Sequence, residues 1–170
     1  MLDILELERQ RVAALIIKNL HCQAGIDVVP AGVGRFLTYV YHKTGFKFSH
    51  IGHGRHHDVF DIVMPDASQL GIVLKLGNKV SIQSELDWAA KFPEDWAKVY
   101  ASFDFGLVCE KVRFIGVDDD PDQLELGDFL VRVKELALRY SSATHDDIGL
   151  IGDRVVITGS SQRLRQPGKS

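Results

Sequence analysis

Apolar residues near the amino terminus recur at the spacing of a helix. From Leu2 to about Leu20 they stand at positions 2, 5, 12, 15, 16 and 20, with charged residues between them. Because a helix brings such positions onto one side, this segment is predicted to be an amphipathic helix, with Gly25 as a natural stop. A second, shorter helix is predicted from about Val33 to His42. The chain is thus expected to open with two helices.

The pattern then changes to the alternation of apolar and polar residues that is typical of strands. Three strands are predicted: one begins at Phe46, one covers Asp58–Val63 and one covers Gly71–Leu76. A glycine-containing turn within Ile51–Phe60 joins the first two, and Pro65–Ser68 form the turn before the third.

The second half of the chain alternates helices with short hairpins. In order, the predicted elements are a helix over Ser81–Phe92, a hairpin of Val99–Phe105 and Leu107–Val112, a helix over Phe129–Tyr140, and a hairpin of Ile148–Leu150 and Val155–Thr158. The whole order is two helices, three strands, a helix, two strands, a helix and a hairpin. It predicts an α+β fold built on an antiparallel sheet.

Composition and charge limit the class of protein. The chain has 170 residues, 45% hydrophobic and 25% charged, which fits one globular domain with a sizeable core. A net charge of -3 gives no sign of nucleic-acid binding, and no apolar run is long enough to span a membrane. The acidic amino terminus is unlike a signal peptide, and Cys22 and Cys109 match no metal or redox spacing. We therefore expect a cytoplasmic protein that binds neither nucleic acid nor membranes.

The first turn and the third strand contain the residues with the most chemical interest. Gly52 and Gly54 would let the backbone approach a phosphate group closely, although an ordinary turn explains the same glycines. Lys75 is different, because an ammonium group inside an apolar strand is costly unless it is paired or faces solvent. Alternation puts Val73 and Lys75 on one face of the strand.

Two alternatives follow for this lysine. It is either an exposed strand lysine or the partner of a carboxylate on the next predicted helix. Glu85 is the first candidate for that carboxylate, and Asp87 competes with it.

Five short segments occur in an informative order. They are Ile51–Gly54, Val59–Phe60, Val73–Lys75, Ser84–Trp88 and Leu107–Val112. Together they resemble the small lobe of protein-kinase-like proteins, in the style of the short kinase-like proteins of bacteria and their phages. The resemblance covers residues 46 to 159.

The resemblance implies a division of the chain. Residues 46–112 would form a kinase-like small lobe with a five-stranded antiparallel sheet and one helix. Residues 113–159 would form a truncated large-lobe remnant, a helix plus a hairpin. Residues 1–45 would be an N-terminal helical extension, and residues 160–170 a flexible tail.

A nucleotide site is implied as well. In the family, a glycine-rich turn covers the phosphates, a strand lysine pairs with a helix glutamate, and the end of the fifth strand leads into the hinge that contacts adenine. ATP and Mg²⁺ would be the ligands. The corresponding residues here are Gly52, Gly54, Val59, Lys75, Glu85, Glu110 and Val112.

The chain departs from the family where catalysis is carried out. Asp147 stands in the place of the metal-binding asparagine, as a candidate metal ligand, but the catalytic aspartate five residues earlier is replaced by Ser142. Gly159 stands where the second metal-binding aspartate is expected, and His57 stands in the place of the third glycine. No catalytic residue is therefore assigned.

These departures predict a pseudokinase that acts by binding another protein. The compact format suggests a phage or mobile-element factor that inhibits or modulates a host enzyme or defence factor. The alternatives are an atypical ATP-dependent phosphotransferase using Lys75, Glu85 and Asp147, and a nucleotide-binding sensor without transfer activity. The apolar side of the first helix also leaves two alternatives, a cover for the sheet or a homodimer contact.

Two further groups of residues need an interpretation. Four histidines surround the first turn: His50, His53, His56 and His57. They either bind a transition metal or form a polar, pH-sensitive surface, and their spacing matches no standard site. Trp88 and Trp96 are predicted to be core residues, and either one would be an interface anchor if it were exposed.

Overall fold

The computed structural model describes residues 3–21, 30–53, 57–112, 131–132, 135–136, 138–139, 148–151 and 154–157. The chain forms two compact units. Unit 1 consists of Met1–Gln83 and Lys98–Glu110, and unit 2 consists of Ser84–Ala97 and Lys111–Ser170.

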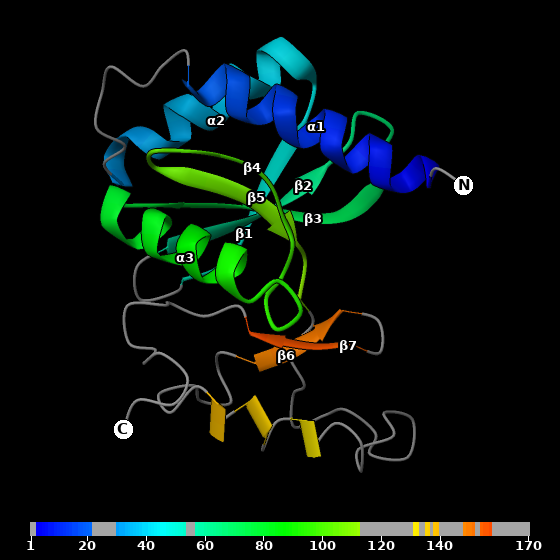
Figure 1. Cartoon of the computed structure of the whole chain (residues 1–170). Coiled ribbons are helices and arrows are strands. Elements are labelled where there is room, and N and C mark those ends of the chain that lie inside the picture. The colour runs from blue at the N-terminus through cyan, green and yellow to red at the C-terminus, as the bar shows by residue number, and fades with distance from the viewer. Residues whose placement is uncertain are drawn as a thin grey trace. The chain divides into compact units, whose positions relative to one another are not determined.

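Unit 1 contains a sheet with helices (Figure 1). Its elements are α1 (Ile4–His21), α2 (Pro30–Thr44), β1 (Lys47–His53), β2 (His57–Val63), β3 (Gln69–Gly77), β4 (Val99–Phe103) and β5 (Gly106–Glu110). Helix α3 (Lys79–Lys91) begins in unit 1 and continues into unit 2.

The five strands form one sheet in the order β1-β2-β3-β5-β4, and every neighbouring pair is antiparallel. The prediction of an α+β fold on a five-stranded antiparallel sheet is confirmed. The β4–β5 hairpin depends on Gly106, which lies opposite Phe103 and Leu76. A Cβ at this position would lie 2.7 Å from a ring carbon of Phe103 and 2.8 Å from a methyl carbon of Leu76, so any larger side chain would push the strands apart.

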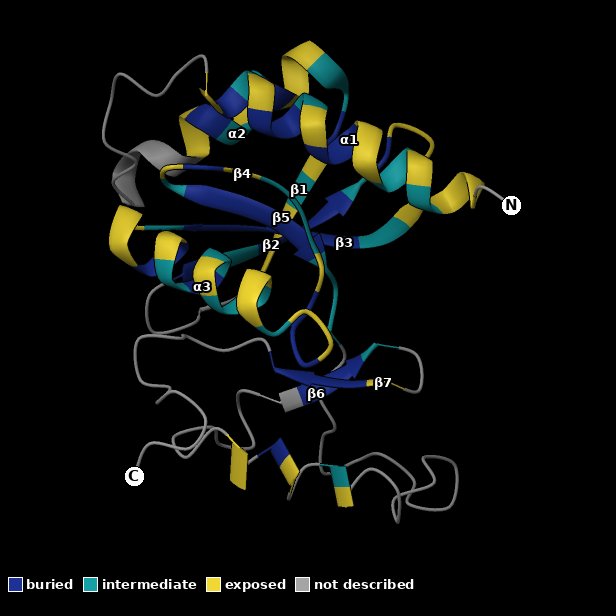
Figure 2. Cartoon of the chain, in the orientation of Figure 1, coloured by how far each residue is buried: buried dark blue, intermediate teal, exposed yellow. Residues whose placement is uncertain are grey.

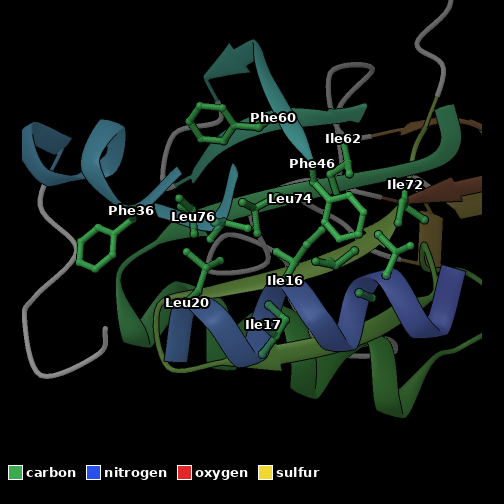
Figure 3. Close-up of a cluster of buried hydrophobic side chains, with 14 of the residues drawn as sticks. Ile16, Ile17, Leu20, Phe36, Phe46, Phe60, Ile62, Ile72, Leu74 and Leu76 are labelled. Atoms are coloured by element: carbon green, nitrogen blue, oxygen red, sulfur yellow. The ribbon is translucent and has the colours of Figure 1, made fainter. Parts of the chain in front are cut away.

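The core of unit 1 lies between α1, α2 and one face of the sheet. Figure 2 shows that α1 has a buried side and an exposed side, and Figure 3 shows Ile16 and Leu20 pointing toward the strands. Ile17 belongs to the same buried cluster. The sheet supplies alternate residues of β2 and β3 to this core, among them Ile62 and Leu74. Each such side chain contributes about 1.5–3 kcal/mol when fully buried. The apolar side of α1 therefore covers the sheet, which was the first of its two predicted roles.

Polar contacts fix the first turns of α1 to the sheet. Glu6 binds the ammonium of Lys98 and accepts a hydrogen bond of 2.9 Å from the hydroxyl of Tyr100, both near the start of β4. Arg9 donates from Nε to the carbonyl of Leu70 in β3 at 2.6 Å. The same end of the helix is thus attached to two different strands.

Most boundaries differ from the predictions by one to three residues, and two of the differences have a clear physical reason. Helix α2 begins at Pro30, three residues before the predicted Val33, because proline has no N–H to leave unsatisfied in a first turn. Gly52 lies inside β1 and not in the turn, since a bulge between His50 and Gly52 lets the strand continue.

The described residues of unit 2 form a core cluster of their own. The hairpin of β6 (Ile148–Ile151) and β7 (Arg154–Ile157) packs with Trp96 and with Leu136, one of six described helical residues between 131 and 139. Trp88 and Trp96 stack with ring centroids 5.6 Å apart, and Trp96 is 1% exposed. The prediction that these tryptophans are core residues is confirmed for Trp96, and Trp88 is half-buried against the same cluster.

A buried carboxylate holds the helical residues of unit 2. Asp95 is 3% exposed and accepts hydrogen bonds from Arg132 at 2.5 Å and from Arg139 at 2.6 Å. Its backbone also bonds to β7, because the N–H of Ile157 donates to the carbonyl of Asp95.

Among the described helices, none has the length and apolar character needed to cross a membrane.

Candidate functional site

Lys75 lies in the middle of the sheet. It belongs to β3, where it lies opposite Val59 of the neighbouring strand β2 and opposite Leu107 of the neighbouring strand β5. Only 4% of its surface is exposed, so the alternative of a solvent-facing strand lysine is wrong. Residues at paired positions project from the same face of a sheet, and Val59 and Leu107 are therefore its immediate apolar neighbours.

The predicted division of β3 into two faces is confirmed. Ile72, Leu74 and Leu76 belong to the core beneath α1 and α2, whereas Val73 and Lys75 do not. We call the face that carries Lys75 the second face of the sheet. Strand alternation and pairing assign its members as His57, Val59, Asp61, Val73, Lys75, Leu107 and Cys109.

Three of these residues are polar and buried: His57, Asp61 and Lys75. His57 pairs with Gly77 and Asp61 pairs with Val73, so each stands diagonally across from Lys75. Diagonal neighbours on one face lie about 7–8 Å apart, within reach of a long side chain. The second face thus brings a carboxylate, an imidazole and an ammonium group together among apolar residues.

The carboxylate of Asp61 is placed to compensate the charge of the buried Lys75 ammonium. A buried ammonium is costly without a counter-charge, and Asp61 is the nearest acid that the strand register places on the same face. Asp61 was not predicted as a member of the site, and His57 was considered only as a replacement for a loop glycine and as one of the four histidines. The sequence signal for both is the alternation of residues along β2, and their position beside Lys75 follows from the pairing of β2 with β3.

The two acids considered on α3 differ in burial. Glu85 is 1% exposed, whereas Asp87 is exposed. Glu85 is thus the acid that requires a compensating partner, as expected for a helix glutamate in a charge pair. Lys75 belongs to unit 1 and Glu85 to unit 2. The ion pair between these two side chains therefore stays a prediction.

The predicted phosphate-binding turn is described only in part. Gly52 pairs with Val59, so it shares the second face with Lys75, next to the bulge in β1. Gly54 lies outside the described residues. The bulge bends β1 at the point where the chain begins the turn.

The predicted hinge lies at the end of β5. The side chain of Glu110 accepts a hydrogen bond of 2.8 Å from the backbone N–H of Lys98, and its own N–H donates to the carbonyl of Lys98 at 3.0 Å. Glu110 therefore closes the open end of the β4–β5 hairpin. Val112 follows it and is half-buried. The adenine contact remains a prediction for both residues.

The remaining predicted positions of the catalytic region cannot be placed. Ser142, Asp147 and Gly159 lie outside the described residues. The assignment of Asp147 as a metal ligand therefore stays a prediction.

The histidine cluster is divided by the sheet. His50 pairs with Phe60, whose side chain belongs to the core beneath the helices, while His57 stands on the second face. His50 contacts Asp58 through its Nε2 atom at 3.4 Å and meets the ring of Phe60 edge-on. His50 and His57 are thus directed away from each other. Among the described residues, no group of three or more His, Cys, Asp or Glu is placed to hold a metal ion; the side chains of His53 and His56 lie outside them.

Comparison with known proteins gave no match, either to a protein-family model or to a curated sequence.

Proposed function

We propose that the chain is a kinase-like protein that lacks phosphoryl-transfer activity and acts by binding another protein. The observation that carries the proposal is the burial of Lys75 in β3, the third strand of the five-stranded sheet. Along the chain, the first three strands are followed by helix α3 and then by the last two strands. This order is compatible with the small lobe that the sequence resembles. The lysine stands at the position that the resemblance expects, but its side chain is buried.

Loss of transfer activity is inferred from the missing groups. Phosphoryl transfer requires a positioned base and cations that neutralise the phosphate charge. Ser142 is a poor base in the place of an aspartate, and Gly159 has no carboxylate to bind magnesium. With 4% of Lys75 exposed, little of its ammonium is available to a phosphate.

Nucleotide titration tests the absence of catalysis. We expect no transfer of labelled phosphate from ATP and no magnesium-dependent rise in melting temperature at millimolar nucleotide. Lys75→Met and Lys79→Met form a matched pair of variants, because Lys79 is an exposed lysine nearby in sequence. Label transfer that persists in Lys79→Met and disappears in Lys75→Met would overturn the proposal.

A nucleotide-binding sensor is the second candidate. It is favoured by one observation: Gly52, Val59 and Lys75 stand side by side on the second face, through pairing of β1, β2 and β3. In the resemblance these are a phosphate-loop glycine, a base-packing residue and the phosphate lysine. ATP binding without transfer, weakened at least tenfold by Lys75→Met, would establish this candidate in place of the first. The atypical phosphotransferase predicts transfer in addition to binding.

The binding activity has its own direct test. Because the compact format suggests a phage or mobile-element factor, the tagged protein is used to capture partners from a bacterial lysate, and a single stoichiometric partner is expected. Recovery of the same partner by Lys75→Met would show that binding does not depend on the nucleotide face. Failure to recover any stoichiometric protein would count against the proposal.

A further inference from the structure

Helix α1 has an exposed side, opposite the side that packs on the sheet (Figure 2). Six exposed residues on it follow one another at intervals of three and four positions. They are Ile4, Leu7, Arg11, Ala14, Lys18 and His21. This spacing repeats every seven residues and is the period of the seam along which two helices pack in a coiled coil. We call these six residues the outer stripe of α1.

The outer stripe is apolar at its first end. Ile4 is 83% exposed and Leu7 is 45% exposed. Residues three positions apart are neighbours on a helix surface, so the two side chains form one apolar patch. Removing such surface from water is favourable by about 25 cal/mol per Å². This end of the stripe therefore favours a partner that covers it.

Charge divides the same helix into two halves. In the segment 3–21 every acidic residue comes before every basic one. The acidic residues are Asp3, Glu6 and Glu8, and the basic residues are Arg9, Arg11, Lys18 and His21. The outer side of α1 is thus acidic and apolar in its first half and basic in its second half.

The charged groups of the outer side can change partners at little cost. Glu6 is held by Lys98 and Tyr100 of the sheet, but Glu8 bonds only within the helix among the printed contacts of its carboxylate, to Arg11 at 3.0 Å and 2.5 Å. Both side chains of this pair are exposed, and such surface pairs contribute little to stability. Glu8 and Arg11 are therefore available to a surface that approaches the stripe.

We propose that the outer stripe of α1 binds the outer stripe of a second copy of the chain, with the two helices antiparallel. Because α1 runs from position 4 to position 21, alignment end to end pairs positions that sum to 25. The opposing pairs are Ile4 with His21, Leu7 with Lys18, and Arg11 with Ala14. Each pair occurs twice, as twofold symmetry requires. The acidic, apolar half of each helix thus lies against the basic half of the other.

The opposing side chains are compatible in size and charge. The aliphatic stem of Lys18 can cover Leu7 of the other copy, while its ammonium reaches toward the neighbouring Glu8. The long side chain of Arg11 meets the small Ala14. No two like charges stand opposite each other in this alignment.

Charge favours a second copy over the other occupants. An acidic helix would match the second half of the stripe but would be repelled by Asp3 and Glu8 in the first half. An anionic membrane would be repelled by the same two acids, and it would require apolar residues along the whole stripe. A parallel second copy would place Lys18 beside Lys18. The dimer goes beyond the proposed function, which the lysate capture tests separately.

Sedimentation equilibrium of the full-length chain, from micromolar to millimolar concentration, measures this self-association. We expect the mass to rise from monomer to dimer. Leu7→Lys should raise the Kd about tenfold or more, because it removes an apolar contact and sets an ammonium opposite Lys18. Leu5→Lys is the matched control, because Leu5 is 44% exposed in the same turn but lies outside the stripe. It should change the Kd less than about twofold.

A charge exchange tests the antiparallel alignment itself. Lys18→Glu alone should weaken the dimer, because it sets a carboxylate beside Glu8 of the other copy. Combined with Leu7→Lys, it should return the Kd to within about threefold of the parent value, since opposite charges then face each other. All these positions are exposed, so the variants are expected to keep the parent melting temperature.

A chain that stays monomeric at millimolar concentration would overturn the inference. Binding of such a chain to vesicles of anionic phospholipid, lost in Leu7→Lys but kept in Leu5→Lys, would assign the stripe to a membrane instead. Equal weakening by Leu7→Lys and Leu5→Lys would also overturn the inference, because it would show that the stripe is not the contact. Failure of the double variant to restore the dimer would exclude the antiparallel alignment.

Discussion

The two units of the molecule are stabilised in different ways. Unit 1 spreads its core over two helices and alternate residues of a five-stranded sheet, and confines His57, Asp61 and Lys75 to the second face. The described residues of unit 2 form an apolar cluster around Trp96, and a buried carboxylate there is bound by two arginines. The cost of truncating a buried side chain rises with the volume of the cavity left behind, so the largest buried side chain is the most costly to remove.

The largest expected effect is therefore at the centre of unit 2. Trp96→Ala removes the largest fully buried side chain of the cluster and should destabilise the protein by about 3–5 kcal/mol. Denaturant unfolding measures the free energy, and hydrogen exchange of the β6 and β7 amides locates the loss. Trp88→Ala is the matched control, because the half-buried partner of the same stack should cost clearly less. Equal costs for the two variants would contradict the assignment of Trp96 as the more deeply buried partner of the stack.

The next effect separates the buried carboxylate from its arginines. The double variant Arg132→Met with Arg139→Met removes the two guanidinium groups that bind Asp95 within the described part of the chain, and should cost roughly 3–5 kcal/mol because a buried charge loses two cationic partners. Asp95→Asn should cost less, about 1–3 kcal/mol, since both arginines are partly exposed and can turn toward water. Chemical denaturation of the three proteins gives the order. A larger loss in Asp95→Asn than in the double variant would show that the carboxylate has a second structural role.

The contrast between the units also shows what the sequence can predict. The helical period of Val12, Ile16 and Leu20 and the alternation of Leu74 and Leu76 are sufficient to assign these residues to the core. Local order is enough here, because each element exposes one face and buries the other. The separation of Lys75 from Ile72, Leu74 and Leu76 of its own strand follows from the same rule.

Features that depend on pairing across the chain were not predicted. The position of Gly52 within β1 depends on a bulge, which two strands define together. The burial of Lys75 depends on what covers the second face and not on alternation alone. Asp95 finds its arginines 37 and 44 residues later, and no local pattern indicates such a contact.

The smallest effect belongs to the polar contacts of unit 1, between α1 and β4. The hydrogen bond from Lys98 is the main cause that lowers the pKa of Glu6, with further contributions from Tyr100 and Arg9. Burial, and then the hydrogen bond to Glu6, raise the pKa of Tyr100 well above its ordinary value. The stabilising contribution of Glu6 therefore changes at acidic pH, and that of Tyr100 changes at alkaline pH.

The sign of each response follows from linkage. Because the pKa of Glu6 is lowered in the folded state, its stabilising contribution is complete above the ordinary glutamate pKa of about 4.3 and is lost as the pH falls below it. Because the pKa of Tyr100 is raised, its contribution is complete below the ordinary tyrosine pKa of about 10 and is lost as the pH rises above it. Between these limits the contacts are at full strength.

Tyr100→Phe isolates the alkaline response. At neutral pH it should destabilise the protein by only about 0.5–1.5 kcal/mol, the net value of one hydrogen bond. The loss of stability above pH 10 should become shallower than in the parent protein, while Tyr41→Phe, at an exposed tyrosine, should leave the parent profile unchanged. Melting temperatures measured across the pH range test this, and an alkaline profile unchanged by Tyr100→Phe would contradict it. A small, pH-dependent effect here beside a large effect at Trp96 would confirm that polar contacts of α1 contribute less than the buried tryptophan.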